Sequence, residues 1–151
     1  MGESLPQPEP QDRGTASMSL RSKAREYALQ MLFQWDMSPE EPERLEARFW
    51  RGARAAKQTR EFANRLFEGA AAQAGALDRL LAAHTENWRT ERLAAIDRAI
   101  LRLAAHELKQ GETPPKVVLD EALELAKKFS SEEARAFING VLDSVLKLLK
   151  Q

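Results

Sequence analysis

Cysteine is missing from the 151-residue sequence, and so is any long apolar run. The first absence excludes disulfides, thiolate metal sites and a cysteine nucleophile. The second excludes a membrane-spanning helix, which needs about 20 consecutive apolar residues. Residues 1–19 also lack the apolar stretch of a secretory signal. Together these absences predict a cytoplasmic protein without a membrane association.

An excess of charge of either sign is missing too, because 23 lysines and arginines balance 23 aspartates and glutamates. Any binding of nucleic acid therefore has to come from local basic patches. The sequence contains no phosphate-binding loop, dinucleotide fingerprint or nucleophile elbow. Its two histidines, His84 and His106, lie far apart and outside metal-binding spacings. We predict a protein that works by binding, with no catalytic residue, metal or cofactor.

Strand patterns are also scarce, whereas helical periodicity covers most of the chain. Residues 1–19, rich in Pro, Gln, Glu, Gly and Ser, are predicted to form a disordered tail. Residues 20–151 are predicted to form one all-α domain, a compact bundle of about six to seven helices. The predicted helices cover about residues 22–36, a short segment that opens at 38, and about residues 58–84, 91–110, 115–128 and 132–149.

Short polar residues mark where several of these helices begin. Ser38 with Glu41, and Ser130 with Glu133, have the spacing of capping boxes. Thr90 is predicted to cap the helix that starts near residue 91. Caps of this kind accept hydrogen bonds from backbone N–H groups that have no partner inside the helix.

Four residues inside the predicted helices are unusual. Gly69 and Gly75 weaken the 58–84 helix by about 1 kcal/mol each relative to Ala, and they predict a kink or a close helix contact. Gly140 allows another backbone or a ligand to approach, and we favour helix packing as its role. Phe137 has two open interpretations, a core residue or a partly exposed ring that stacks on an unpaired base.

Asp97 is an acid on an otherwise apolar helix stripe, together with Leu101 and Leu108. We interpret it as a partly buried carboxylate that pairs with an arginine or with a helix end. The alternative role of a general acid or base has no visible partner in the sequence.

Two basic clusters are candidate phosphate contacts. Arg21, Lys23 and Arg25 follow the predicted tail, with no acid between them. The second cluster has a basic residue at every third position of residues 48–60, with no acid in between: Arg48, Arg51, Arg54, Lys57 and Arg60. The alternative for each cluster is a solvated charged helix face, because most charge runs face solvent.

Four segments in order resemble the NusB family of transcription antitermination proteins. They are residues 25–35 (REYALQMLFQW), 96–108 (IDRAILRLAAHEL), 115–129 (PKVVLDEALELAKKF) and 137–143 (FINGVLD), and the resemblance covers about residues 20–148. It implies a fold of two small helical bundles packed together. It also implies binding of the boxA element in leader and ribosomal RNA transcripts, jointly with the ribosomal protein NusE, in a complex that makes RNA polymerase resist termination.

The resemblance also assigns site residues. Arg21, Lys23 and Arg25 match the basic N-terminal RNA-binding segment of the family, and Phe137 with Glu133 matches the C-terminal part of its RNA surface. The basic stretch of Arg48, Arg51 and Arg54 is not part of the family pattern, and we hypothesise that it adds phosphate contacts.

Two other functions and the oligomeric state stay open. A protein-binding helical adaptor without RNA contact fits the zero net charge. A stand-alone RNA-binding module, related to the N-terminal domains of RNA methyltransferases, fits the same fold, although no cofactor domain is expected after residue 151. Both a monomer and a homodimer are compatible with the sequence.

Overall fold

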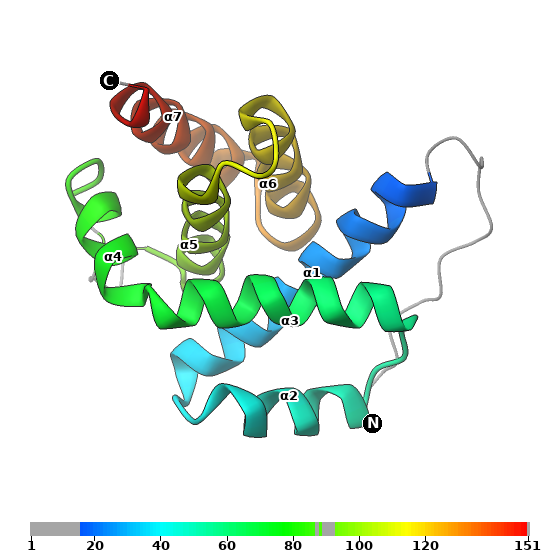
Figure 1. The fold of residues 1–151 in the computed structure, drawn as a ribbon. Coiled ribbons are helices and arrows are strands. Elements are labelled where there is room, and N and C mark those ends of the chain that lie inside the picture. The colour runs from blue at the N-terminus through cyan, green and yellow to red at the C-terminus, as the bar shows by residue number, and fades with distance from the viewer. Residues whose placement is uncertain (1–15, 87, 89–92, 151) are drawn as a thin grey trace. The chain divides into compact units, whose positions relative to one another are not determined.

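A computed structural model describes residues 16–86, 88 and 93–150. In these residues it contains seven α-helices and no strand, which confirms the all-α prediction (Figure 1). The helices are α1 (Ala16–Met37), α2 (Pro42–Arg51), α3 (Lys57–Ala72), α4 (Ala74–Ala82), α5 (Ala95–Gln110), α6 (Pro115–Phe129) and α7 (Glu132–Leu149). None of the described helices is long and apolar enough to span a membrane. The chain divides into two compact units, Met1–Glu68 and Gly69–Gln151.

The first unit is organised around an aromatic cluster that joins α1 to α2. The Tyr27 ring packs edge-on against Phe49 and Trp50, at centroid distances of 5.9 and 5.0 Å. Its hydroxyl group donates a hydrogen bond to the Arg54 carbonyl oxygen at 3.0 Å, just after α2. Trp50 Nε1 donates to Asn64 Oδ1 at 2.8 Å, which ties α2 to α3. Tyr27 therefore links α1 to α2, and Trp50 links α2 to α3.

The second unit is built around α5, which contacts α4, α6 and α7 (Figure 1). Residues 99–108 of α5 are all buried, as expected for a helix with two apolar stripes. Gly111 ends α5 in the left-handed conformation, with a φ of 75°. Only glycine adopts this conformation readily, and it is the common way to end a helix.

The helix predicted for residues 58–84 is wrong, because the chain forms two helices there. Gln73 separates α3 from α4. The two glycines that flank this break lower the helix propensity on both sides of it. Gly69 also makes the close contact that its position predicted, since a Cβ atom there would lie 2.5 Å from His106 Cε1.

Two predicted caps were also wrong. Glu41 is the N-cap of α2 and Pro42 is its first residue, so Ser38 lies outside the helix. Ser131 caps α7 by accepting a hydrogen bond from the Ala134 backbone N–H at 3.0 Å. Ser130 bonds elsewhere, as described below.

Two further predictions concern residues at or beyond the limits of the described part of the chain. α1 begins at Ala16, so the boundary predicted at residue 19 for the tail comes too late. Residues 1–15 of that tail, and the predicted cap Thr90, lie outside the described residues.

Candidate nucleic-acid interface

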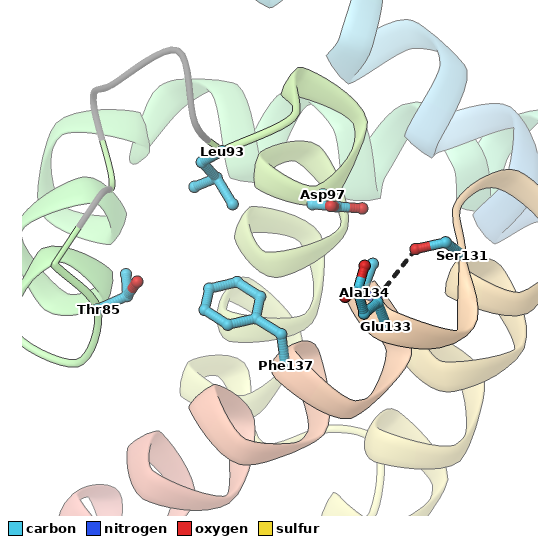
Figure 2. A pocket seen from close by; sticks show the side chains of 7 residues that line it. All are labelled: Thr85, Leu93, Asp97, Ser131, Glu133, Ala134 and Phe137. Atoms are coloured by element: carbon cyan, nitrogen blue, oxygen red, sulfur yellow. Dashed lines mark hydrogen bonds between the residues drawn. The ribbon is translucent and has the colours of Figure 1, made fainter.

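The second unit contains a cavity of about 350 Å³ beside the start of α7 (Figure 2). We call it the Phe137 pocket. The Phe137 side chain is 38% exposed, and its ring points between Thr85 and Leu93. The remaining lining residues are Asp97, Ser131, Glu133 and Ala134. This exposure contradicts the interpretation of Phe137 as a core residue, and its stacking on a base stays a prediction.

Asp97 forms the acidic part of the pocket wall. It lies in the first turn of α5, where the helix dipole stabilises a carboxylate. The residue is 7% exposed, and Asp97 Oδ1 accepts a hydrogen bond from the Ser130 hydroxyl group at 2.6 Å. This bond explains why Ser130 does not cap α7. The arrangement agrees with a partly buried acid at a helix end. In the described part of the chain, no group of three or more potential ligands could hold a metal ion.

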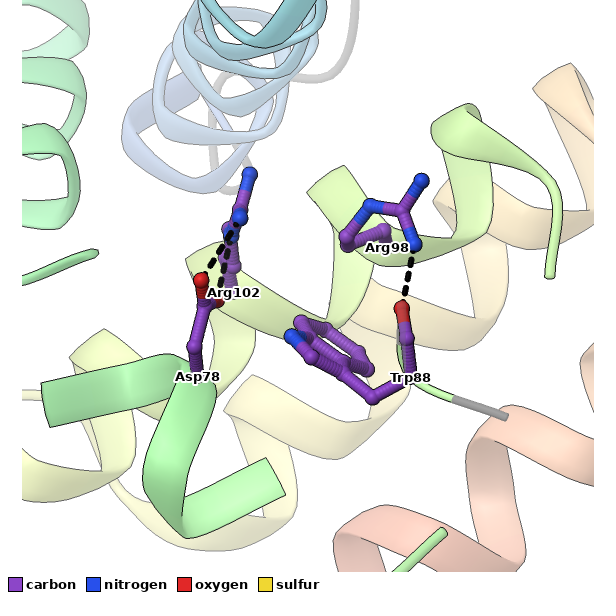
Figure 3. A network of polar contacts seen from close by, with 4 residues as sticks. All are labelled: Asp78, Trp88, Arg98 and Arg102. Atoms are coloured by element: carbon purple, nitrogen blue, oxygen red, sulfur yellow. Dashed lines mark hydrogen bonds and ion pairs between the residues drawn. The ribbon is translucent and has the colours of Figure 1, made fainter. Parts of the chain in front are cut away.

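Trp88 is a buried residue of the segment between α4 and α5 (Figure 3). Its side chain is 3% exposed, and the guanidinium groups of Arg98 and Arg102 each lie 5.8 Å from the ring. Arg98 also donates a hydrogen bond to the Trp88 carbonyl oxygen. Arg102 in turn forms two hydrogen bonds with Asp78 of α4, at 2.8 and 2.9 Å. The same segment supplies Thr85 and Leu93 to the Phe137 pocket.

Sequence reasoning did not find this network. A signal was present, because Arg98 and Arg102 stand one helical turn apart on an apolar helix, where unpaired cations are costly. Such a pair indicates buried partners, but the sequence does not say which.

The outer face of α7 is open beyond Phe137. Gly140 is exposed, and a Cβ atom added there would meet nothing within 4 Å. The packing role expected for Gly140 is therefore wrong. Glu133 and Asn139 are exposed as well. On the neighbouring side of the helix, Ser144 Oγ is hydrogen-bonded to His84 Nδ1 at 2.6 Å.

The first basic cluster, in α1, is less uniform than its sequence suggested. Arg21 is exposed, whereas Arg25 is only 3% exposed. Lys23 is half-buried and forms an ion pair with Glu26 at 3.4 Å. Lys23 Nζ also lies 5.5 Å from the centre of the Tyr27 ring. The structure therefore leaves Arg21 as the most accessible of the three cations.

The second basic cluster is partly neutralised. Arg48 forms two hydrogen bonds with Glu40, at 2.9 and 2.5 Å. Hydrogen bonding between the two side chains raises the pKa of Arg48 and lowers the pKa of the Glu40 carboxyl group. The sequence did not reveal the pair because Glu40 precedes the acid-free stretch. Arg51 and Arg54 are exposed.

These features define an all-α protein with exposed arginines on its first unit and a pocket of aromatic and carboxylate side chains on its second. A family model described as the NusB family matches residues 22–147. The chain belongs to the NusB family. A transcription antitermination protein NusB from Koribacter versatilis is 45% identical, over 89% of this chain and 94% of the relative.

Two solved structures are similar in fold. A NusB structure from T. maritima has a TM-score of 0.74 and 32% identity, and the match covers 84% of this chain and 90% of that one. A structure of the antitermination factors NusB and NusE in complex with dsRNA has a TM-score of 0.77 and 29% identity, and the match covers 87% and 98% of the two chains.

Proposed function

We propose that this protein is a transcription antitermination factor that binds boxA RNA in leader and ribosomal RNA transcripts. It acts in the cytoplasm together with the ribosomal protein NusE, and the complex helps RNA polymerase to resist termination. Membership of the NusB family supports this proposal. A relative that was solved with NusE and dsRNA supports the two partners. The observation that carries RNA binding on this chain is the exposed Phe137 ring beside a cavity.

The pocket residues suit an unpaired base. The face of Phe137 offers a stacking platform, a common means of binding single-stranded RNA. Glu133 and Asp97 offer carboxylate oxygens, which accept hydrogen bonds from base amino groups or ribose hydroxyl groups. Neither role requires a bond to be made or broken, so the protein works by binding and not by catalysis.

The basic residues suit the RNA backbone. Arg21, Lys23 and Arg25 supply positive charge on α1. Arg51 and Arg54 add phosphate contacts, and Arg48 does so when RNA displaces Glu40 from it.

The test is a fluorescence-anisotropy titration of a labelled boxA RNA, with and without NusE. We expect Phe137→Ala to weaken binding about fivefold or more, because one stacked base contributes about 1–3 kcal/mol. Leu148→Ala is the matched control, since Leu148 is also an exposed apolar residue of α7, at 45%. Absence of RNA binding under both conditions would refute the proposal. Binding of NusE alone would then favour the protein-binding adaptor.

A further inference from the structure

Three arginine side chains converge on one aromatic ring in the first unit. The guanidinium carbon of Arg21 lies 4.6 Å from the centre of the Phe62 ring. Those of Arg25 and Arg65 lie 5.4 and 5.3 Å from it. Arg21 and Arg25 come from α1, whereas Arg65 comes from α3 and belongs to neither of the two basic clusters of the sequence analysis.

A cavity of about 340 Å³ lies beside this cluster, and we call it the Phe62 pocket. It is lined by Leu20, Arg21, Gln58, Thr59, Glu61, Phe62 and Arg65. Thr59 is 4% exposed and belongs to the pocket wall rather than to the open surface. The carboxylate of Glu61 lies 4.0 Å from Lys57 Nζ, which partly offsets its negative charge.

The cations of this pocket are incompletely compensated. Arg21 and Arg65 form no ion pair with any residue that the structure describes. A ring face attracts a cation only weakly at an accessible site, and it cannot offset the mutual repulsion of the Arg21 and Arg65 guanidinium groups. The pocket also lies at the start of α3, where the first backbone N–H groups have no acceptor inside the helix. An anion that enters the pocket therefore relieves an existing repulsion.

Guanidinium groups favour phosphate as the bound anion. Their planar N–H donors match the oxygens of a phosphate, and a hydroxyl group such as that of Thr59 adds a neutral donor. We infer that Arg65 and Phe62 complete, with Arg21, a binding site for one phosphate group of the RNA backbone. Arg65 contacts the phosphate, and Phe62 positions the guanidinium groups. The inference rests on the proposed function, because it assigns further residues to the RNA that this function requires.

The experiment compares four proteins in RNA titrations over a range of salt concentrations: the natural chain, Arg65→Gln, Phe62→Leu and Arg79→Gln. We expect Arg65→Gln to weaken binding about tenfold and to reduce the salt slope by about 0.7, the value for one phosphate on single-stranded RNA. Arg79→Gln is the control, because Arg79 is an exposed arginine of α4 outside the pocket. Phe62→Leu keeps the apolar volume but removes the ring face, so we expect a smaller loss of affinity.

A second measurement uses the natural chain and does not depend on variants. The arginine Nε–H resonances of Arg21 and Arg65 are followed by NMR on addition of RNA, and separately on addition of inorganic phosphate. We expect RNA to shift both resonances.

The outcomes are distinct. If the natural chain binds no RNA, the proposed function fails. If it binds RNA while Arg65→Gln behaves like Arg79→Gln, only the Phe62 pocket is refuted. A response of Arg65 to inorganic phosphate but not to RNA would likewise overturn the assignment to the RNA backbone.

Discussion

The contact between Gly69 and His106 gives a quantitative prediction. His106 is 1% exposed, and a Cβ atom on Gly69 would lie 2.5 Å from His106 Cε1. No real Cβ contact is this short, so Gly69→Ala forces the buried ring or α3 to move. Overpacking of this kind costs about 1–3 kcal/mol. The higher helix propensity of Ala relative to Gly offsets up to about 1 kcal/mol of this cost. We expect Gly69→Ala to lower the free energy of unfolding by about 1–2 kcal/mol.

A double-mutant cycle tests the cause. In a His106→Ala background the clash is absent, so Gly69→Ala should be neutral or stabilising by up to about 1 kcal/mol. Gly140→Ala is the control in both backgrounds, because a Cβ atom there meets nothing within 4 Å. The assay is urea unfolding followed by circular dichroism. An equal loss of stability for Gly69→Ala in both backgrounds would show that the His106 contact is not the cause.

Three further predictions concern other sites. Burial and the neighbouring Glu68 raise the pKa of Glu46 to about 8. The folded state then retains a proton on Glu46 that the unfolded state releases above about pH 4.5. The free energy of unfolding should therefore fall as the pH rises from 4.5 towards 8. Urea melts of Glu46→Gln should show a flatter dependence on pH. Asp78→Ala should cost about 3 kcal/mol or more, because it deprives the buried Arg102 of its carboxylate, whereas a loss below about 1 kcal/mol would contradict this. Replacing Arg51 and Arg54 by Glu should weaken RNA binding and reduce its salt slope, and an unchanged slope would rule out phosphate contacts there.

Periodicity was sufficient to predict the helices but not their junctions. The apolar spacing located the second unit well, because α5 to α7 bury clear stripes and end at strong stop signals such as Gly111. It missed the break at Gln73, where the helical pattern continues on both sides. The predicted cap of α7 was wrong because a tertiary contact decides which serine is available. Ser130 has the capping-box spacing with Glu133 and Ser131 lacks it, yet Ser130 bonds to the Asp97 carboxylate, which is distant in sequence, and Ser131 caps α7.

The candidate site was predictable in part for a similar reason. Sequence identifies which residues are cationic, but not which of them the fold leaves accessible. Arg25 stands in the same cluster as Arg21 and yet is buried, because it lies on the face of α1 towards Phe62. Arg65 was missed because α3 carries charges along much of its length, and only the structure brings this one to the ring that Arg21 covers.

The Phe137 pocket depends on buried charges that do not line it. Helix α5 supplies Asp97 to the pocket. It also supplies Arg98 and Arg102, whose guanidinium groups lie over the Trp88 ring. Thr85 and Leu93, which precede and follow Trp88 in the sequence, line the same pocket. A buried ion pair adds little stability compared with an apolar pair of similar shape. The Asp78–Arg102 pair therefore contributes most by defining geometry, because it orients Arg102 against the Trp88 ring.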